Sequence, residues 1–172
     1  MKKLKYRPTY TQLIVLGFLS IIVLGSLLLS MPFASKAGVW TPYTDALFTA
    51  TSATCVTGLV AYDTYSYWSL GGQTIILILI QIGGIGIMSV IALFSILFKR
   101  QIPLSERRLL MQSAGAIRIS GVVQLILQMA RITFIVEGIG ALLLSIRFIP
   151  DMGLAPGIYN AVFHSVSTFC NA

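Results

Sequence analysis

The sequence predicts an all-α membrane protein in which a unit of helix, re-entrant hairpin and helix is repeated. Of its 172 residues, 56% are hydrophobic and only 10% are charged, whereas soluble proteins carry roughly 25% charged residues. The mean hydropathy is correspondingly high, at +0.89. The pattern of residues 43–57 also recurs at residues 158–172, each time after a long apolar run. We therefore take the lipid bilayer as the solvent and the recurring pattern as the architectural unit.

Three apolar runs are long enough to cross ~30 Å of hydrocarbon as helices, which takes about 20 residues. They cover residues 10–31, 71–98 and 122–149. The first run follows a basic start and precedes the small residues ASKAG, a combination that also resembles a secretory signal peptide. Its apolar core is longer than the roughly 7–15 residues of a signal sequence, and two further runs follow. We expect it to be retained as the first membrane helix.

The basic residues predict the orientation of these helices, because short loops rich in Lys and Arg stay on the cytoplasmic side. The segment between the first and second runs carries only Lys36 against Asp45 and Asp63. We expect a multi-pass protein of the plasma membrane with a cytoplasmic N-terminus. The formal charge of +7 is then a topology signal, reinforced by anionic lipid of the inner leaflet, and gives no support to nucleic-acid binding. Nine of the twelve basic residues precede the first run or separate the second from the third: Lys2, Lys3, Lys5, Arg7, Lys99, Arg100, Arg107, Arg108 and Arg118.

Residues 32–70 are too apolar for a solvated loop and too interrupted for a membrane-crossing helix. Thr41 is a suitable N-cap, Pro42 suits the first helical position and Asp45 favours the first turn, so we expect a short helix from Thr41. It should end at β-branched residues and at Gly58, which permits a positive φ. Non-helical backbone at membrane depth survives only where it is buried in protein or lines a wet cavity. The alternative is an extracellular loop with a surface helix, in which Gly58 forms a simple turn.

An internal repeat favours the re-entrant interpretation. A shift of 115 positions aligns YTDALFTATSATCVT with IYNAVFHSVSTFCNA, and four of the fifteen positions are identical. Pro42 and Pro156 stand near the two starts, and the second short helix is expected from Gly157. The predicted organisation is a first helix, pore loop and helix unit at 1–98, a cytoplasmic basic linker at 99–118, and a second unit at 119–172 that stops within its pore loop.

This repeated pattern resembles the Trk/Ktr/HKT superfamily of K⁺ and Na⁺ translocating proteins. The similarity covers the whole chain and is closest to the Ktr-type membrane subunit, because the first apolar run leads directly into the first hairpin. Such proteins fold four repeats of one chain around a central pore, with about one filter glycine per repeat. The chain is therefore expected to be an N-terminal fragment that ends one residue before its second filter glycine. The segments that carry the resemblance are TSATCVTGL at 51–59, IQIGGIGIM at 80–88, VEGIGALLL at 136–144 and FHSVSTFCNA at 163–172.

The resemblance implies the membrane subunit of a potassium uptake system, with or without coupling to sodium. Backbone carbonyls would replace the hydration shell of the ion, and the partially negative C-terminal ends of the two short helices would point at it. Such conduction needs no covalent chemistry, so we expect no enzymatic activity. Apart from transported K⁺ or Na⁺, no metal and no cofactor is expected in this chain. The implied ion filter consists of Thr54, Cys55, Val56, Thr57 and Gly58, with Phe169, Cys170, Asn171 and Ala172 as a facing quadrant.

The resemblance also implies partners: a homodimer of the complete protein and a cytosolic nucleotide-binding regulatory ring beneath it. Nucleotide would then act only through the ring. A candidate docking surface lies in residues 99–118, where Pro103 can start a basic, partly apolar helix that carries Arg107, Arg108 and Met111. The same segment would suit the surface of anionic membrane lipid, and the sequence does not separate these two interpretations.

The remaining polar and small residues are interpreted as packing residues. Cys55 and Cys170 occupy equivalent positions in two different filters, so no disulfide is expected between them. His164 is expected to be a hydrogen-bonded packing residue rather than a metal ligand. Arg131 should snorkel toward the inner surface, and Glu137 should bond a helix outside this chain. The glycines of GGIGIM at 83–88 should permit close helix packing and are not a nucleotide loop.

Two other function classes stay open on the sequence. An intramembrane enzyme would have to use Asp63, Glu137 or His164, although no paired-carboxylate or nucleophile motif accompanies them. A non-transporting membrane scaffold, or a truncated inactive fragment, is the second alternative. Two further units of the repeat later in the reading frame would argue against it.

Overall fold

The computed structural model describes residues 10–86, 89, 90, 108, 111 and 122–172. Within these ranges the chain forms helices and turns, with one isolated bridge between Ser35 and Trp68 in place of any strand. The predicted all-α fold is therefore confirmed. In chain order the elements are α1 (Tyr10–Ser30), the 3-10 helix η1 (Pro32–Ala34), α2 (Tyr43–Cys55), α3 (Thr64–Tyr67), α4 (Leu70–Ile85), α7 (Val122–Met152) and α8 (Leu154–Cys170).

Two helices have the length and composition of membrane spans. They are Thr11–Ser30 within α1 and Val123–Met152 within α7. The 21 residues of α1 correspond to about 32 Å of helix, close to the thickness of the hydrocarbon core. Both agree with the first and third predicted runs, although α7 continues three residues further and takes in Pro150 near its end.

The second predicted run, residues 71–98, is not one continuous helix. Its helix α4 ends at Ile85, and Gly86 caps it with φ 86° while donating its N–H toward the carbonyls of Ile82 and Gly83. Residues 89 and 90 are helical again, and residues 91–98 lie outside the described part of the chain. The sequence does not reveal this break, because a glycine leaves the hydropathy of an apolar run high while permitting the positive φ that ends the helix.

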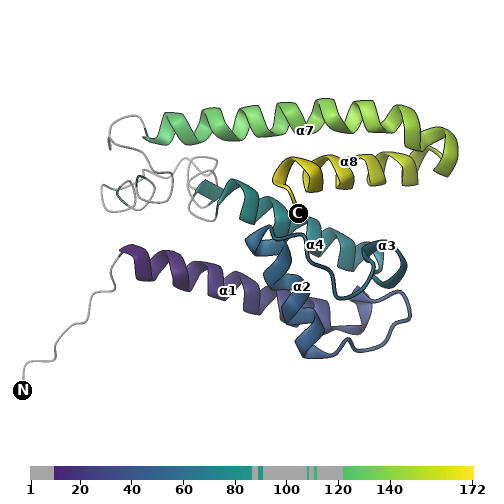
Figure 1. The fold of residues 1–172 in the computed structure, drawn as a ribbon, viewed down its shortest axis with the longest axis horizontal. Coiled ribbons are helices and arrows are strands. Elements are labelled where there is room, and N and C mark those ends of the chain that lie inside the picture. Colours follow the sequence, from purple (N-terminus) through teal and green to yellow (C-terminus); the bar gives the residue numbers. More distant parts are fainter. Residues whose placement is uncertain (1–9, 87–88, 91–107, 109–110, 112–121) are drawn as a thin grey trace, which may run out of the picture.

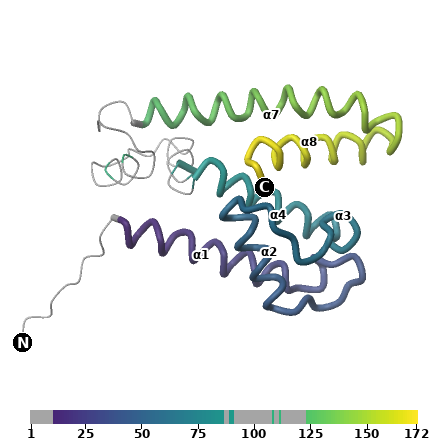
Figure 2. Tube along the Cα trace, viewed as in Figure 1, coloured from purple at the N-terminus to yellow at the C-terminus, as the bar shows by residue number. Residues whose placement is uncertain are grey.

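The helices are arranged in two groups that meet along α4. In Figure 1, α7 and α8 lie side by side as an antiparallel pair, and α4 lies between this pair and α1. The shorter helix α2 packs against both α1 and α4. Figure 2 shows the chain turning after α7 and returning along α8, so that the C-terminus lies beside the middle of the molecule. The α1/α2/α4 core is formed mainly by small and aliphatic side chains, among them Leu29, Ala46, Ala50, Ile76, Leu79 and Ile80.

The start of α2 differs from the prediction. Pro42 occupies the N-cap position and the helix begins at Tyr43, so Thr41 is not the N-cap. The Thr41 hydroxyl instead pairs with the Tyr67 hydroxyl at 3.1 Å, which ties the segment before α2 to α3. Asp45 lies in the first turn as expected. A side-chain partner elsewhere in the fold has therefore replaced the local capping bond.

The second short helix begins earlier than predicted. Helix α8 starts at Leu154, not at Gly157, and follows Gly153 with φ 87° as its N-cap. Pro156 falls in the first turn, where its missing N–H does no harm. A Cβ placed on Gly157 would lie 2.8 Å from the Ile149 Cα, so this glycine permits the tight turn between α7 and α8.

Candidate functional site

The two short helices end in the same unusual backbone turn. Val56 follows α2 with φ 56° and ψ 43°, and Asn171 follows α8 with φ 63° and ψ 40°. The next residue donates its N–H five residues back in both cases, from Thr57 to Ser52 at 3.0 Å and from Ala172 to Ser167 at 2.9 Å. These are Schellman-type caps. The repeat predicted from the sequence is thus reproduced down to single backbone angles, at positions 115 residues apart.

A serine hydroxyl supports each turn from inside the hairpin. The Thr57 hydroxyl donates to the Ser52 hydroxyl at 3.0 Å. In the second hairpin the Ser167 hydroxyl donates to the Ala172 carbonyl oxygen. Ser52 and Ser167 are one of the four identical pairs of the repeat, so the sequence contained a signal for this role.

The two left-handed positions differ in strain. Asn tolerates the left-handed region, whereas a β-branched residue such as Val56 is a clear outlier there. Strained backbone of this kind costs about 1–3 kcal/mol and is concentrated at functional sites. Two residues after Val56, Gly58 has φ 71°, which confirms the positive φ expected from its sequence context.

The two hairpins meet at their tips. A Cβ placed on Gly58 would lie 3.6 Å from the Ala172 carbonyl carbon, an ordinary van der Waals distance, so the two turns are separated by about the width of one methyl group. A cavity of about 130 Å³ borders both tips, and the hydroxyl-bearing residues Thr49, Ser52 and Ser167 are among those that line it. Cys55 is exposed, whereas Cys170 is half-buried, and both are free thiols. The structure therefore brings the two predicted filter segments side by side.

A glycine pair in α4 lies against both hairpins at once. A Cβ on Gly83 would lie 2.9 Å from the Thr54 carbonyl carbon and from Val56 Cγ2, and closer still to the Thr54 carbonyl oxygen. A Cβ on Gly84 would collide with the Cys170 sulfur and lie 3.1 Å from its Cβ. The expected close packing is confirmed for Gly83 and Gly84, whereas Gly86 has no atom within 4 Å of its Cβ position and caps α4 instead. The partners of the glycine pair, the ends of the two hairpins, were not foreseen.

Thr54 differs from the other first-hairpin filter residues. It is only 1% exposed, and its hydroxyl donates to the Ala50 carbonyl at 2.7 Å within α2. Its own carbonyl oxygen faces Gly83. Thr54 thus anchors the hairpin on α4, and the turn proper consists of Cys55, Val56, Thr57 and Gly58.

Glu137 has hydrogen-bond partners within the chain, in addition to the bond expected with a helix outside it, which stays a prediction. The Gln81 Nε2 in α4 donates to Glu137 Oε2 at 3.1 Å, and the Ser165 hydroxyl in α8 donates to the Glu137 carbonyl at 2.6 Å. Glu137 is 6% exposed. One residue of α7 therefore connects all three helices around the second hairpin, and Gln81 is a polar partner that sequence reasoning missed.

The loop between α2 and α3 holds two residues whose pKa values are shifted. The Tyr62 hydroxyl donates to Asp45 Oδ2 at 2.5 Å, and this hydrogen bond raises the pKa of Tyr62. Asp63 caps α3 by accepting from the Ser66 N–H at 2.7 Å, and hydrogen bonding from the side chain and then the backbone of Ser66 lowers the pKa of Asp63. Both contacts fasten the loop that follows the first hairpin.

Other candidate residues occupy separate places. His164 is exposed, with its ring centroid 5.4 Å from that of Phe148, and the hydrogen bond expected for its ring is not found in the described ranges. In the predicted docking segment, Arg108 and Met111 are helical, while Arg107 lies outside the described residues. No cluster of three or more His, Cys, Asp or Glu suited to a metal occurs among the described residues.

Comparison with known proteins agrees with this geometry. The family model TrkH, cation transport protein, matches residues 5–172. Potassium/sodium uptake protein NtpJ of Enterococcus hirae is 43% identical over 99% of the chain and 38% of its own length. Ktr system potassium uptake protein B of Bacillus subtilis is 39% identical over 96% of the chain, and that of Vibrio alginolyticus 36% identical over 99%; the chain covers 37% of each. The chain thus spans less than two fifths of the length of these relatives. It belongs to the TrkH family of cation transport proteins, as the repeated hairpins predicted.

Proposed function

We propose that the complete protein is the membrane subunit of a cation uptake system and that the two hairpin tips form part of its selectivity filter. The observation that carries this proposal is the duplicated left-handed turn, at Val56 and Asn171, with Gly58 against Ala172. The relatives are named for uptake of potassium, or of potassium and sodium. We take K⁺ as the conducted ion, with Na⁺ as a second substrate or coupling ion.

The physical basis is the supply of oxygen ligands by the backbone. Left-handed turns redirect successive carbonyl groups out of the helix direction, so they are available to a cation instead of to the next helical N–H. The carbonyls of Cys55–Gly58 and of Phe169–Ala172 then replace part of the hydration shell of the ion. The C-terminal ends of α2 and α8 add a partial negative charge. Thr54 positions this backbone through its contact with α4.

The assembly around this filter is also a proposal. A homodimer of the complete protein would lie in the plasma membrane with its N-terminus in the cytoplasm, because the basic residues predict that orientation. A cytosolic nucleotide-binding ring would dock on the segment with Arg107, Arg108 and Met111. The helical state of Arg108 and Met111 supports a helix in this segment.

The test compares two glycines with the same backbone requirement. Gly58 has φ 71° and lies beside the second hairpin, whereas Gly38 has φ 67° with no atom within 4 Å of its Cβ position. The complete gene containing this sequence is expressed in cells that lack K⁺ uptake, as wild type, Gly58→Ala and Gly38→Ala. We expect wild type and Gly38→Ala to restore growth on low K⁺, and Gly58→Ala to lose discrimination of K⁺ from Na⁺.

Membrane abundance, measured by immunoblot, serves as the control for expression. A wild-type protein that is present in the membrane with its cytosolic partner and gives no rescue would contradict the uptake function and favour a scaffold. Rescue by Gly58→Ala with unchanged K⁺/Na⁺ discrimination would instead contradict the filter assignment alone.

A further inference from the structure

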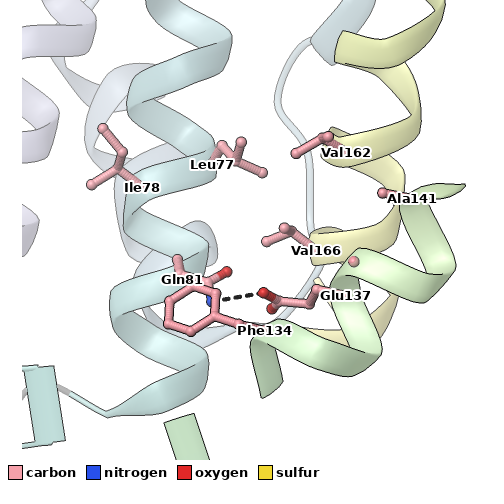
Figure 3. Close-up of a pocket in the computed structure, with 9 residues that line it drawn as sticks. Leu77, Ile78, Gln81, Phe134, Glu137, Ala141, Val162 and Val166 are labelled. Atoms are coloured by element: carbon pink, nitrogen blue, oxygen red, sulfur yellow. Dashed lines mark hydrogen bonds between the residues drawn. The ribbon is translucent and has the colours of Figure 1, made fainter. Parts of the chain in front are cut away.

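Glu137 and Gln81 are hydrogen-bonded to each other in the wall of an open cavity between α4, α7 and α8 (Figure 3). The cavity has a volume of about 380 Å³ and is otherwise lined by apolar and small residues, including Leu77, Phe134, Val162 and Val166. A carboxyl group in such surroundings is expensive to ionise unless it is paired. Its partners therefore decide its state.

The hydrogen bond between the two side chains leaves two oxygens unpaired. Gln81 Nε2 donates to Glu137 Oε2 at 3.1 Å. The other oxygen of each group, Glu137 Oε1 and Gln81 Oε1, is buried without a hydrogen-bond partner in the described part of the protein. Both are acceptors, and a buried acceptor without a donor costs its desolvation free energy. The pair is thus short of one donor.

A single proton would supply that donor. A protonated carboxyl has one O–H donor, and the free amide oxygen of the side chain already bonded to it is the nearest chemical complement. Carboxylic acid and amide then form a closed ring of two hydrogen bonds, N–H to carboxyl and O–H to amide. We propose that Glu137 is held as a neutral carboxylic acid that donates to the Gln81 amide oxygen and locks α7 to α4.

The charged neighbours offer no competing explanation. Helix α4 contains no ionisable residue. On α8, Cys170 lies close enough to interact electrostatically with Glu137 but carries no positive charge, and His164 packs on Phe148. On α7 itself Arg131 is exposed and six positions away, off the same helix face. No cation of these elements faces the carboxyl.

The location gives this pair a positioning role at the candidate filter. Gln81 lies two residues before Gly83, the glycine that packs against Thr54. The Glu137 carbonyl accepts a hydrogen bond from the Ser165 hydroxyl, and Ser165 lies five residues before Cys170. The closed pair therefore fixes the position of α4, against which both hairpins pack. This role deepens the proposed function, although the protonation state itself does not depend on conduction.

The experiment uses the complete protein purified in detergent, with three variants. Glu137→Gln retains a closed ring as an amide pair, Glu137→Ala opens it, and the double exchange Gln81→Glu with Glu137→Gln restores an acid and an amide in reversed positions. Infrared difference spectra against Glu137→Gln report a protonated carboxyl directly, and thermal melting reports the lock.

We expect wild type at pH 7 to show a protonated-carboxyl band that Glu137→Gln lacks and that the double exchange recovers. Glu137→Gln and the double exchange should melt close to wild type, and Glu137→Ala several degrees lower. Carboxylate bands in place of the protonated band, or a loss of stability in Glu137→Gln as large as that in Glu137→Ala, would overturn the proposal and indicate an ionised or cation-bound Glu137. Neither readout requires transport, so failure here is distinct from failure of the uptake function.

Discussion

Adding one methyl group at Gly83 should displace the first hairpin, although no residue of the hairpin itself is replaced. In Gly83→Ala the new Cβ would lie 2.9 Å from the Thr54 carbonyl carbon and from Val56 Cγ2, where ordinary contacts begin at 3.4 Å. The Thr54 carbonyl oxygen would lie closer still, so the neighbours must separate by clearly more than half an ångström, which exceeds the ~0.5 Å tolerance of a functional constellation. The obstacle is mainly backbone, so no side-chain rotation relieves it.

The energetic cost follows from two opposing terms. Overpacking a close contact costs about 1–3 kcal/mol, and replacing Gly by Ala inside a helix returns roughly 1 kcal/mol. The difference between these terms is a net destabilisation of about 0–2 kcal/mol for Gly83→Ala. Gly138→Ala in α7 is the matched control, because its Cβ position has no atom within 4 Å. It should be neutral or stabilising by up to about 1 kcal/mol.

Two measurements check this prediction in the complete protein. Thermal melting in detergent should separate Gly83→Ala from Gly138→Ala, and competition of K⁺ with Na⁺ uptake in cells should show reduced selectivity for Gly83→Ala only. Equal melting and equal selectivity for the two variants would refute the reasoning, because the α4 contact would then not constrain the hairpin.

Three further predictions concern the turns, the loop between α2 and α3, and the inner face. Val56→Gly should stabilise the protein by about 1 kcal/mol, because it removes a strained left-handed valine, while Asn171→Gly should change melting much less; equal effects in melting experiments would contradict the strain at Val56. Protection of α3 against limited proteolysis should be complete at pH values above about 4, where the Asp63 carboxylate is ionised, and should decrease as the pH is lowered further. The reason is that the lowered pKa of Asp63 ties its hydrogen bond with Ser66 to the ionised form of the carboxyl group. Asp63→Asn should make the protection much less dependent on pH. Arg107→Glu with Arg108→Glu should weaken co-purification with the cytosolic ring while membrane insertion persists, and unchanged co-purification would leave the segment as a topological anchor.

Local and repeated features of the fold were predictable from the sequence. The first apolar helix, the short helix that ends in a turn and the positive φ at Gly58 follow from apolar length, β-branched residues and glycine chemistry, which act over a few residues. The alignment at a shift of 115 positions also placed both hairpin ends correctly, because the pattern was present twice.

Features that depend on contacts between distant segments were not predictable. Thr41 has the chemistry of an N-cap, but the Tyr67 hydroxyl, 26 residues away, takes its hydroxyl. The partner of Glu137 lies 56 residues earlier, in an apolar helix whose periodicity does not show which face meets α7. The end of α4 at Gly86 was hidden because its flanking residues are as apolar as those of the helix.

The two left-handed turns carry different amino acids on one polypeptide, and this has an evolutionary consequence. In an assembly of identical subunits, a substitution at such a turn appears in every copy together. Here Val56 and Asn171 are separate codons, so mutation and selection act on each turn independently. Under the proposed filter assignment, a lineage can therefore adjust ion preference in small, asymmetric steps, keeping one turn unchanged while the other varies.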